Sequence, residues 1–181
     1  MNFLVIGSGA REHIIAHKLF EAGANVFSII TNRNPGLISL SKEYLFVNTY
    51  KENIQNIMDF SISKDIACVV IGPEDPLALG FSDLFWSKGI PVVGPTKNLA
   101  QIETSKGFTR DLLGRNEIYV SPRYERFNSV NGVEDFIRDL SEQYVVKYDG
   151  LMGGKGVKVS GEHLMSIQEA ISYCNKLIEL G

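Results

Sequence analysis

Short apolar runs alternate with helical segments over the first half of the chain, and this alternation constrains the fold more than any other feature. The runs are short and apolar enough to be strands, and turn residues bound them. The expected strands are Asn2–Ile6, Asn25–Ile30, Tyr44–Val47, Ile66–Ile71 and Ile90–Val93. Three helices are expected between them: one that ends near Ala22, one over about Lys51–Ser61 and one over Leu77–Lys88. Strands that alternate with helices form a parallel sheet with helices on both faces. We therefore predict an α/β fold with an open doubly wound parallel sheet.

The first strand ends in a glycine-rich turn, Gly7-Ser8-Gly9, that leads into a helix. A dinucleotide-binding fingerprint would place a third glycine at position 12 and an acidic residue at the end of the second strand. Position 12 is occupied by Glu12 instead of glycine, and the second strand is followed by Thr31-Asn32-Arg33 without an acidic residue. The pattern therefore disfavours NAD. The helix N-terminus after Gly9 still offers N–H groups and a positive dipole end to an anion.

A second loop of interest follows the apolar strand Ile66–Ile71 and reads Gly72-Pro73-Glu74-Asp75-Pro76. Ligands of open α/β sheets bind at the carboxyl ends of the strands, so Glu74 and Asp75 are candidates to face a substrate. A structural interpretation explains the same residues equally well. Pro76 suits the first turn of a helix, and neighbouring acidic side chains complement the helix dipole. The sequence leaves both interpretations open.

The pattern changes after Gly94-Pro95-Thr96, where two helical segments follow in succession, about Lys97–Ile102 and Ser105–Asn116. The rest of the chain predicts a small α+β unit. Its expected elements are a short strand pair around Pro122–Phe127, a helix from about Gly132 to Ser141, a hairpin over Tyr144–Val159 and a final helix opened by the capping box Ser166-Ile167-Gln168-Glu169. We place the boundary near Ile118, which gives domains of residues 1–118 and 119–181.

The hairpin carries the sequence KYDGLMGGKGVKV from Lys147 to Val159, which is typical of a strand, a glycine-rich turn and a strand. Glycines let backbone N–H groups approach an anion closely, and the ammonium groups of Lys147 and Lys155 suit phosphate oxygens. A Walker A loop is excluded, because the glycine spacing is one residue short, Gly156 stands where Ser or Thr is required, and a strand follows instead of a helix. The plainer alternatives are a hairpin turn without a ligand and, for Lys106, a solvated surface position.

Composition narrows the possible partners. The 181 residues are 44% hydrophobic and 22% charged with a formal net charge of -3, which suits one or two globular domains and gives no basic surface for nucleic acid. No apolar run approaches the roughly 18 residues of a membrane span, and the chain enters a strand directly, without a signal peptide. We expect a cytoplasmic protein that binds neither nucleic acid nor membrane. Cys68 and Cys174 fit reduced thiols and lack the spacing of a metal site.

With these residues in hand, the chain resembles the glycinamide ribonucleotide synthetase family of the ATP-grasp superfamily. Four stretches carry the resemblance in order: IGSGAREH at 6–13, GPEDPLALG at 72–80, GPTKNLAQIETSKGFTRDLL at 94–113 and KYDGLMGGKGVKV at 147–159. The last stretch alone would indicate only an ATP-grasp lid, whereas the second and third are more specific. The resemblance implies a pre-ATP-grasp domain followed by a lid subdomain. It also implies a ligase of de novo purine biosynthesis that joins glycine to 5-phosphoribosylamine through glycyl phosphate.

The resemblance further implies which residues bind ligands. Lys106 and Lys147 match lysines that hold ATP phosphates, and Gly153 to Val157 matches a lid that protects the hydrolysable acyl phosphate from water. The residues expected at ATP are Lys106, Lys147, Asp149, Gly150, Gly153, Gly154, Lys155, Gly156 and Val157, and those expected to face phosphoribosylamine are Gly7, Ser8, Gly9, Arg11, Glu12, His13, Glu74 and Asp75. Tyr148 and Met152 depart from the small residues usual in the family, which puts the packing of the lid in question.

The family enzyme is more than twice as long as this chain, and its Mg²⁺ ligands lie in the C-terminal part. We therefore expect ATP and Mg²⁺ as cofactors, no catalytic residue or metal ligand within this chain, and the C-terminal remainder of the enzyme as a partner. The chain alone is expected to be inactive. Two other interpretations stay open: a nucleotide- or phosphate-binding module without catalysis, and another ATP-grasp carboxylate-amine ligase. GPEDPLALG and IETSKGFTRDLL argue against the second of these.

Overall fold

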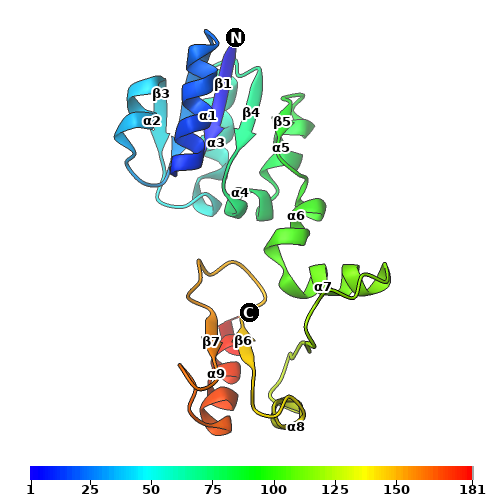
Figure 1. Cartoon of the computed structure of the whole chain (residues 1–181). Coiled ribbons are helices and arrows are strands. Elements are labelled where there is room, and N and C mark those ends of the chain that lie inside the picture. Colours follow the sequence, from blue (N-terminus) through cyan, green and yellow to red (C-terminus); the bar gives the residue numbers. More distant parts are fainter. Residues whose placement is uncertain (181) are drawn as a thin grey trace. The chain divides into compact units, whose positions relative to one another are not determined.

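The computed structural model describes residues 1–180 and divides the chain into two compact units, Met1–Gln101 and Ile102–Gly181 (Figure 1). This boundary lies closer to the N-terminus than the position near Ile118 that the sequence suggested. The difference arises because helix α7 (Lys106–Arg115) belongs to the second unit. The first turn of α7 is hydrogen-bonded to Asp149, and these contacts hold the helix there.

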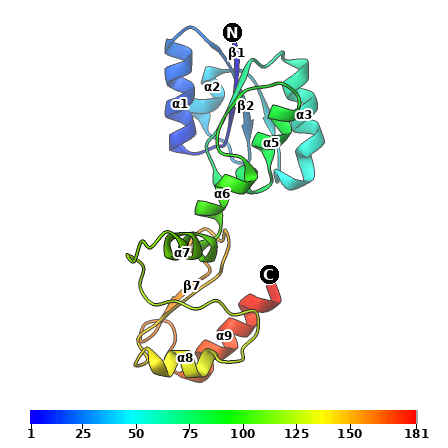
Figure 2. The ribbon, with the colours of Figure 1, turned by 90° about the vertical axis from the view of Figure 1, so that its right-hand side faces the viewer.

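The first unit is an open sheet of five parallel strands in the order β3-β2-β1-β4-β5. The strands are β1 (Asn2–Ile6), β2 (Asn25–Ile30), β3 (Ser41–Phe46), β4 (Cys68–Ile71) and β5 (Val92–Val93), and the helices are α1 (Ala10–Glu21), α2 (Pro35–Leu40), η1 (Lys51–Asn53), α3 (Ile54–Ser63), α4 (Glu74–Ala78) and α5 (Phe81–Ser87). A further helix, α6 (Lys97–Thr104), spans the boundary between the units. Helices α1 and α2 cover one face of the sheet, and α3 and α5 cover the other (Figure 2). The predicted α/β fold is confirmed.

The core of this unit follows from the alternation of side chains along the strands. Leu4 and Ile6 of β1 are fully buried in the cluster that includes Phe85 of α5. Val5, which lies between them, points to the opposite face and packs in a second cluster with Ala16 of α1. Complete burial of a side chain of this size contributes roughly 1.5 to 3 kcal/mol. The two clusters therefore fix the helices on both faces of the sheet.

The direction in which the sheet is built reverses between β1 and β4. Strands β1, β2 and β3 extend to one side, and the chain then returns to place β4 beside β1 with β5 beyond it. Ile6 pairs with Ile71 at the ends of these strands, and the Gly72 N–H donates to the Ile6 carbonyl at 3.0 Å. The loops that begin at Gly7 and Gly72 therefore lie side by side. A crevice at such a reversal is where open α/β sheets bind ligands.

The second unit is the small α+β unit that the sequence predicted. It contains α7, α8 (Val133–Asp139), the antiparallel strands β6 (Val145–Lys147) and β7 (Val157–Val159), and α9 (Ile167–Leu180). Its core joins Val133 and Ile137 of α8 to Ala170 of α9, with Leu164 between β7 and α9 in sequence. None of the helices within residues 1–180 has the length and apolar character needed to cross a membrane.

The predicted capping residues at the start of α9 are in place. The Oγ atom of Ser166 accepts a hydrogen bond from the Glu169 N–H at 3.2 Å. The Glu169 carboxylate in turn accepts from the Met165 N–H at 2.7 Å. Two free donors at the helix N-terminus are thereby satisfied, although the return bond goes to Met165 instead of Ser166.

Three local expectations differ from the structure. The segment around Pro122–Phe127 forms no strand among the described residues, and its Tyr124 and Arg126 side chains reach α7 instead. The single helix expected over Leu77–Lys88 is divided into α4 and α5, because Gly80 between them has a φ of 86°. The sequence analysis also missed α2, whose N-cap Asn34 accepts from the Leu37 N–H at 3.2 Å.

Candidate functional sites

Glu12 lies where the two loops of the first unit meet. Its side chain is in the first turn of α1 and is only 4% exposed. Oε2 accepts a hydrogen bond from the Gly9 N–H at 2.7 Å, and Oε1 accepts from Arg11 Nε at 3.2 Å. A carboxylate at this position satisfies a free donor of the helix and complements the helix dipole. Part of the anion-binding capacity expected at this helix N-terminus is therefore taken up by the helix's own side chain.

Two glycines leave the space that the Glu12 side chain fills. A Cβ atom on Gly72 would lie 2.1 Å from Glu12 Oε1, and one on Gly7 would lie 2.5 Å from Glu12 Cγ. Gly7 also has a φ of 131°, a conformation that favours glycine. Position 12, where a dinucleotide fingerprint would have a glycine, thus carries the side chain that closes the gap between the loops.

Arg11 and Glu74 form the exposed part of the same arrangement. Arg11 Nη2 lies 3.4 Å from Glu74 Oε1, and the side chains are 60% and 32% exposed. The pKa of Arg11 is raised, first by its hydrogen bond to Glu12 and then by the one to Glu74. A cationic donor and an anionic acceptor therefore stand together beside these two loops. Of the eight predicted substrate residues, the structure brings together Gly7, Gly9, Arg11, Glu12 and Glu74.

The other three predicted substrate residues have different surroundings. Ser8 Oγ accepts from the Thr31 N–H at 2.8 Å and so ties the first loop to the end of β2. His13 packs against α2, where a Cβ on Gly36 would lie 2.1 Å from its Cε1 atom. Asp75 is in the first turn of α4 and lines a pocket.

Sequence reasoning missed this pocket, which has a volume of about 540 Å³. It is lined by Thr31, Asn32, Asn48, Thr49, Tyr50, Lys51, Asp75, Ala78 and Leu79. Burial raises the pKa of Tyr50 to about 12, so its phenol is a neutral hydrogen-bond donor near pH 7. A signal was available, because Thr31 and Asn32 follow β2, Asn48 and Thr49 come soon after β3, and the carboxyl ends of parallel strands share one edge of the sheet.

In the second unit, the glycine-rich loop connects β6 to β7. Lys147 pairs with Val157 at the end of the hairpin, and the Tyr148 N–H donates to the Gly156 carbonyl at 2.8 Å. Gly153 and Gly154 have φ values of 53° and 79°. These positive angles strain other residues, so the tip of the loop depends on glycine. The strand, turn and strand expected here are observed.

Tyr148 and Met152 pack against glycines of the loop. A Cβ atom on Gly156 would lie 2.7 Å from Met152 Sδ and 2.8 Å from Tyr148 Cβ. One on Gly150 would lie 2.4 Å from Tyr148 Cε1. The two residues that depart from the small side chains of the family therefore support the loop by contact with two of its glycines.

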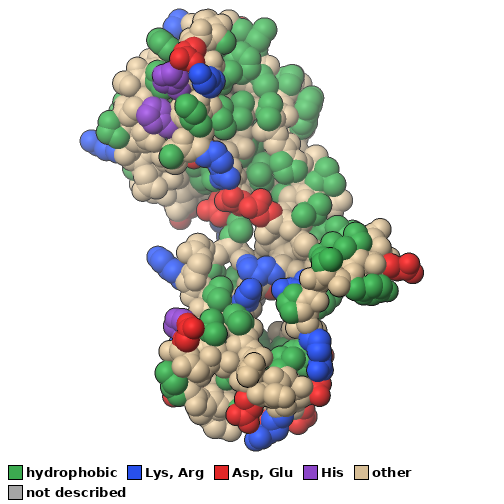
Figure 3. Space-filling view, in the orientation of Figure 1, with side chains coloured by type: hydrophobic (Ala, Val, Ile, Leu, Met, Phe, Trp, Pro, Cys, Tyr) green, Lys and Arg blue, Asp and Glu red, His purple; other side chains and the backbone are tan. Residues whose placement is uncertain are grey.

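The three predicted lysines differ in their surroundings. Lys106 Nζ donates to the Gly150 carbonyl at 2.8 Å, so this lysine holds the loop at its start. Lys147 and Lys155 are exposed, and their ammonium groups form no ion pair with any residue that the structure describes. Lysine and arginine side chains gather around this loop and α7 on the face seen in Figure 3. The loop therefore presents positive charge to solvent.

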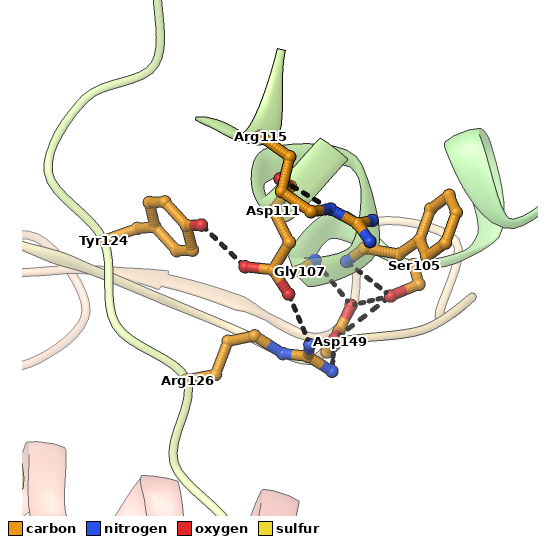
Figure 4. A network of polar contacts seen from close by, with 8 residues as sticks. Ser105, Gly107, Asp111, Arg115, Tyr124, Arg126 and Asp149 are labelled. Atoms are coloured by element: carbon orange, nitrogen blue, oxygen red, sulfur yellow. Dashed lines mark hydrogen bonds and ion pairs between the residues drawn. The ribbon is translucent and has the colours of Figure 1, made fainter. Parts of the chain in front are cut away.

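Asp149, predicted at ATP, is engaged by protein donors at the start of α7 (Figure 4). Its carboxylate accepts from Ser105 Oγ at 3.1 Å, from the Gly107 N–H at 3.1 Å and from Arg126 Nη2 at 3.1 Å. Ser105 is the N-cap of α7. A carboxylate near a helix N-terminus is stabilised by the helix dipole. The contacts of Asp149 thus join the loop to α7.

Asp111 of α7 binds the other side of the same arginine. Its Oδ2 atom lies 3.0 Å from Arg126 Nη1, and its Oδ1 atom accepts from the Tyr124 hydroxyl at 2.7 Å. The pKa of Asp111 is lowered, mainly by the Tyr124 hydrogen bond and then by Arg126, and that of Tyr124 is raised by the same bond. Sequence analysis missed Tyr124 and Arg126, since no spacing or motif marked them.

The close approach of the Glu12 side chain to Gly72 can be tested by a double-mutant cycle. Gly72→Ala should lower the free energy of unfolding by about 1 to 3 kcal/mol, because the new methyl group overlaps the Glu12 carboxylate. In a Glu12→Ala background the same change should cost much less, which gives a coupling of about 0.5 to 3 kcal/mol. Urea unfolding can be followed by the fluorescence of Trp86, the single tryptophan, which lies in the first unit with Gly72 and Glu12. Additive costs would contradict the contact.

The Asp111 contacts predict a pH dependence. Since the folded-state pKa is lowered, the stabilisation is present above the ordinary Asp value and is lost as the pH falls through the lowered value. Tyr124→Phe removes the main cause, so the Asp111 pKa should rise towards its ordinary value in a carbon-13 NMR titration. Tyr119→Phe, at a tyrosine that is 82% exposed, should leave it unchanged. Equal effects of both variants would refute the assignment.

Two family models match the chain in succession. Residues 1–103 match the N domain of phosphoribosylglycinamide synthetase, and residues 104–181 match its ATP-grasp (A) domain. Their junction lies close to the boundary between the two compact units.

Relatives named phosphoribosylamine-glycine ligase match almost the whole chain. The one from Methanosarcina barkeri is 36% identical over 183 residues, which cover 100% of this chain and 42% of the relative. The one from Methanococcus vannielii is 42% identical over 184 residues, which cover 99% of this chain and 41% of the relative. The chain thus spans about two-fifths of the length of these relatives.

Solved structures share the fold. Phosphoribosylamine-glycine ligase from Thermotoga maritima is 24% identical with a TM-score of 0.70, and the match covers 97% of this chain and 39% of that one. An ADP complex of N5-carboxyaminoimidazole ribonucleotide synthetase is 15% identical with a TM-score of 0.74, and the match covers 99% and 45%. The matched models and relatives together show that the chain belongs to the phosphoribosylglycinamide synthetase family.

Proposed function

We propose that this chain is the N-terminal part of an ATP-dependent ligase that joins glycine to 5-phosphoribosylamine and gives glycinamide ribonucleotide, ADP and phosphate. The first unit would bind phosphoribosylamine, and the second would contribute the lid and lysines for ATP. The observation that carries the proposal is the glycine-rich loop with two exposed lysines, Lys147 and Lys155, that form no ion pair within residues 1–180. The relatives that match over the whole chain are named for this reaction.

The polar side chains where the two loops of the first unit meet suit a phosphorylated sugar amine. Such a molecule has hydroxyl and amino groups that donate hydrogen bonds and a phosphate that accepts them. Glu74 offers an acceptor and Arg11 a charged donor, and both are partly open to solvent. Glu12 is buried and already has two donors, so its role is to orient Arg11 and Gly9. We assign ligand contact to Arg11 and Glu74 and positioning to Glu12.

The loop of the second unit suits a chain of phosphates. Lys147 is the last residue of β6 and Lys155 lies within the turn, and both carry charges that no protein group neutralises among the described residues. A charge-assisted hydrogen bond to a phosphate oxygen is worth about 1.5 to 3 kcal/mol. Closure of such a loop over ATP would also keep water from an acyl phosphate. Lys106 would contribute by holding the loop at Gly150.

Mg²⁺ is part of the proposal, because it neutralises the phosphates during phosphoryl transfer. Residues 1–180 contain no group of three or more His, Cys, Asp or Glu side chains that could hold a metal ion. We propose that its ligands come from the C-terminal remainder of the enzyme. A cytoplasmic location and independence from nucleic acid and membranes complete the proposal.

The lysines give the direct test of the nucleotide site. In the complete protein, Lys147→Ala and Lys155→Ala should each weaken ATP binding about tenfold, because one charge-assisted contact is lost. The melting temperature should stay almost unchanged, since both side chains are exposed. Calorimetric titration measures the first quantity and thermal unfolding the second. Lys176→Ala, at an exposed lysine of α9, is the matched control. Normal ATP affinity in both loop variants would show that the hairpin is a turn that binds no nucleotide.

The ligase assignment has its own assay. Residues 1–181 should release no ADP above background when mixed with glycine, Mg-ATP and freshly prepared phosphoribosylamine. The complete protein should turn over at about 1 to 1000 per second, as enzymes commonly do. Residues 1–181 are expected to be inactive because the proposed metal ligands lie in the C-terminal remainder of the enzyme. Normal turnover by residues 1–181 would show that they carry the whole catalytic site, and a lack of turnover by the complete protein would refute the ligase function.

A further inference from the structure

We propose that Arg126 is a positioning residue, which fixes the start of the glycine-rich loop against α7 and so sets the direction of Lys147 for its phosphate. The inference rests on the proposed binding of a nucleotide by this loop. Arg126 lies in the segment between α7 and α8, and no motif or family stretch described above includes it.

The guanidinium group of Arg126 links two parts of the unit that are far apart in sequence. Nη1 lies 3.0 Å from Asp111 Oδ2 on α7, and Nη2 lies 3.1 Å from Asp149 Oδ2 at the start of the loop. The planar guanidinium holds its donors in a fixed geometry, so binding both carboxylates also fixes their separation. The Tyr124 hydroxyl binds the other oxygen of Asp111 and thereby limits its rotation (Figure 4).

The first turn of α7 completes the attachment. Ser105 Oγ and the Gly107 N–H both donate to Asp149, and Lys106 Nζ donates to the carbonyl of Gly150. Three consecutive residues of the helix thus contact two consecutive residues of the loop. These contacts follow Lys147 by only two and three positions along the chain, so they restrict the backbone that carries its side chain.

Gly107 shows that space is reserved for the arginine. A Cβ atom there would lie 2.3 Å from Arg126 Nε and 2.5 Å from Arg126 Cδ. Glycine inside a helix is less favourable than alanine. An exposed ion pair contributes little to stability, so the arrangement gains little for folding. Its effect is to order a loop, and order before binding improves affinity.

Gly107→Ala separates positioning from stability. The methyl group should displace the flexible guanidinium while the helix gains a better former, so the melting temperature should stay equal or rise. In the complete protein, affinity for Mg-ADP should fall about five- to tenfold, and Arg126→Ala should cause a similar loss. The double variant should lose no more than either single variant, because both remove the same contact. Arg126→Lys should restore part of the affinity.

Two matched variants serve as controls. Gly114→Ala adds a methyl group in the same helix, where nothing lies within 4 Å of it. Arg123→Ala removes another arginine of the same segment, which pairs with Asp139 and does not touch the loop. Both should bind Mg-ADP like the unchanged protein. A lowered melting temperature with Gly107→Ala, or an equal loss of affinity in the controls, would overturn the positioning role.

Amide hydrogen exchange without nucleotide tests the positioning by itself. The N–H groups of Tyr148 and Lys155, which donate to Gly156 and Met152, should exchange about tenfold faster in Gly107→Ala and Arg126→Ala. Unchanged exchange would refute the role of Arg126 even if ADP binds. Faster exchange in a protein that fails to bind ADP would support Arg126 as the anchor of the loop and refute the proposed nucleotide function instead.

Discussion

The parallel pairing of β1 with β4 brings the two loops that begin at Gly7 and Gly72 together. Because Ile6 and Ile71 are in register, the loops at Gly7 and Gly72 meet at one edge of the sheet, although they are far apart in sequence. The space between them is filled by the Glu12 carboxylate, which is tolerated in this buried position because both of its oxygens have donors. Beside these loops, Arg11 and Glu74 keep partly exposed polar groups.

Both units contain a carboxylate that is hydrogen-bonded at a helix N-terminus, but the two contacts have different effects on the structure. Each places a carboxylate at the N-terminus of a helix, where free N–H groups and the dipole favour negative charge. In the first unit the carboxylate is Glu12, which belongs to the helix itself and closes a local turn. In the second unit it is Asp149, which comes from a distant loop and is bound by Gly107. The Glu12 contact stabilises the turn at the start of its own helix, whereas the Asp149 contact attaches a loop to a helix that is distant in sequence.

The sequence predicted what depends on local pattern. Apolar runs such as Asn25–Ile30 identified the strands, and glycine spacing identified the hairpin turn. It did not predict the break at Gly80, since a glycine inside a helical pattern is compatible with either outcome. Nor could it predict the partners of Arg126, because the apolar and polar pattern of a segment does not say which distant carboxylates its side chain will reach. Lys155 was identified as a candidate because glycines enclose it, and Lys147 because an apolar strand leads it into the same loop.

The distribution of charge in the second unit leaves a positively charged loop in a chain whose formal net charge is -3. Near the loop, Asp111 and Asp149 share Arg126 and additional neutral donors, so their negative charges are compensated by the protein. The lysines of the loop have no such partners among the described residues. Net charge is a sum over the whole surface, whereas an anion within a Debye length of the loop, about 8 to 10 Å, responds mainly to the uncompensated lysines.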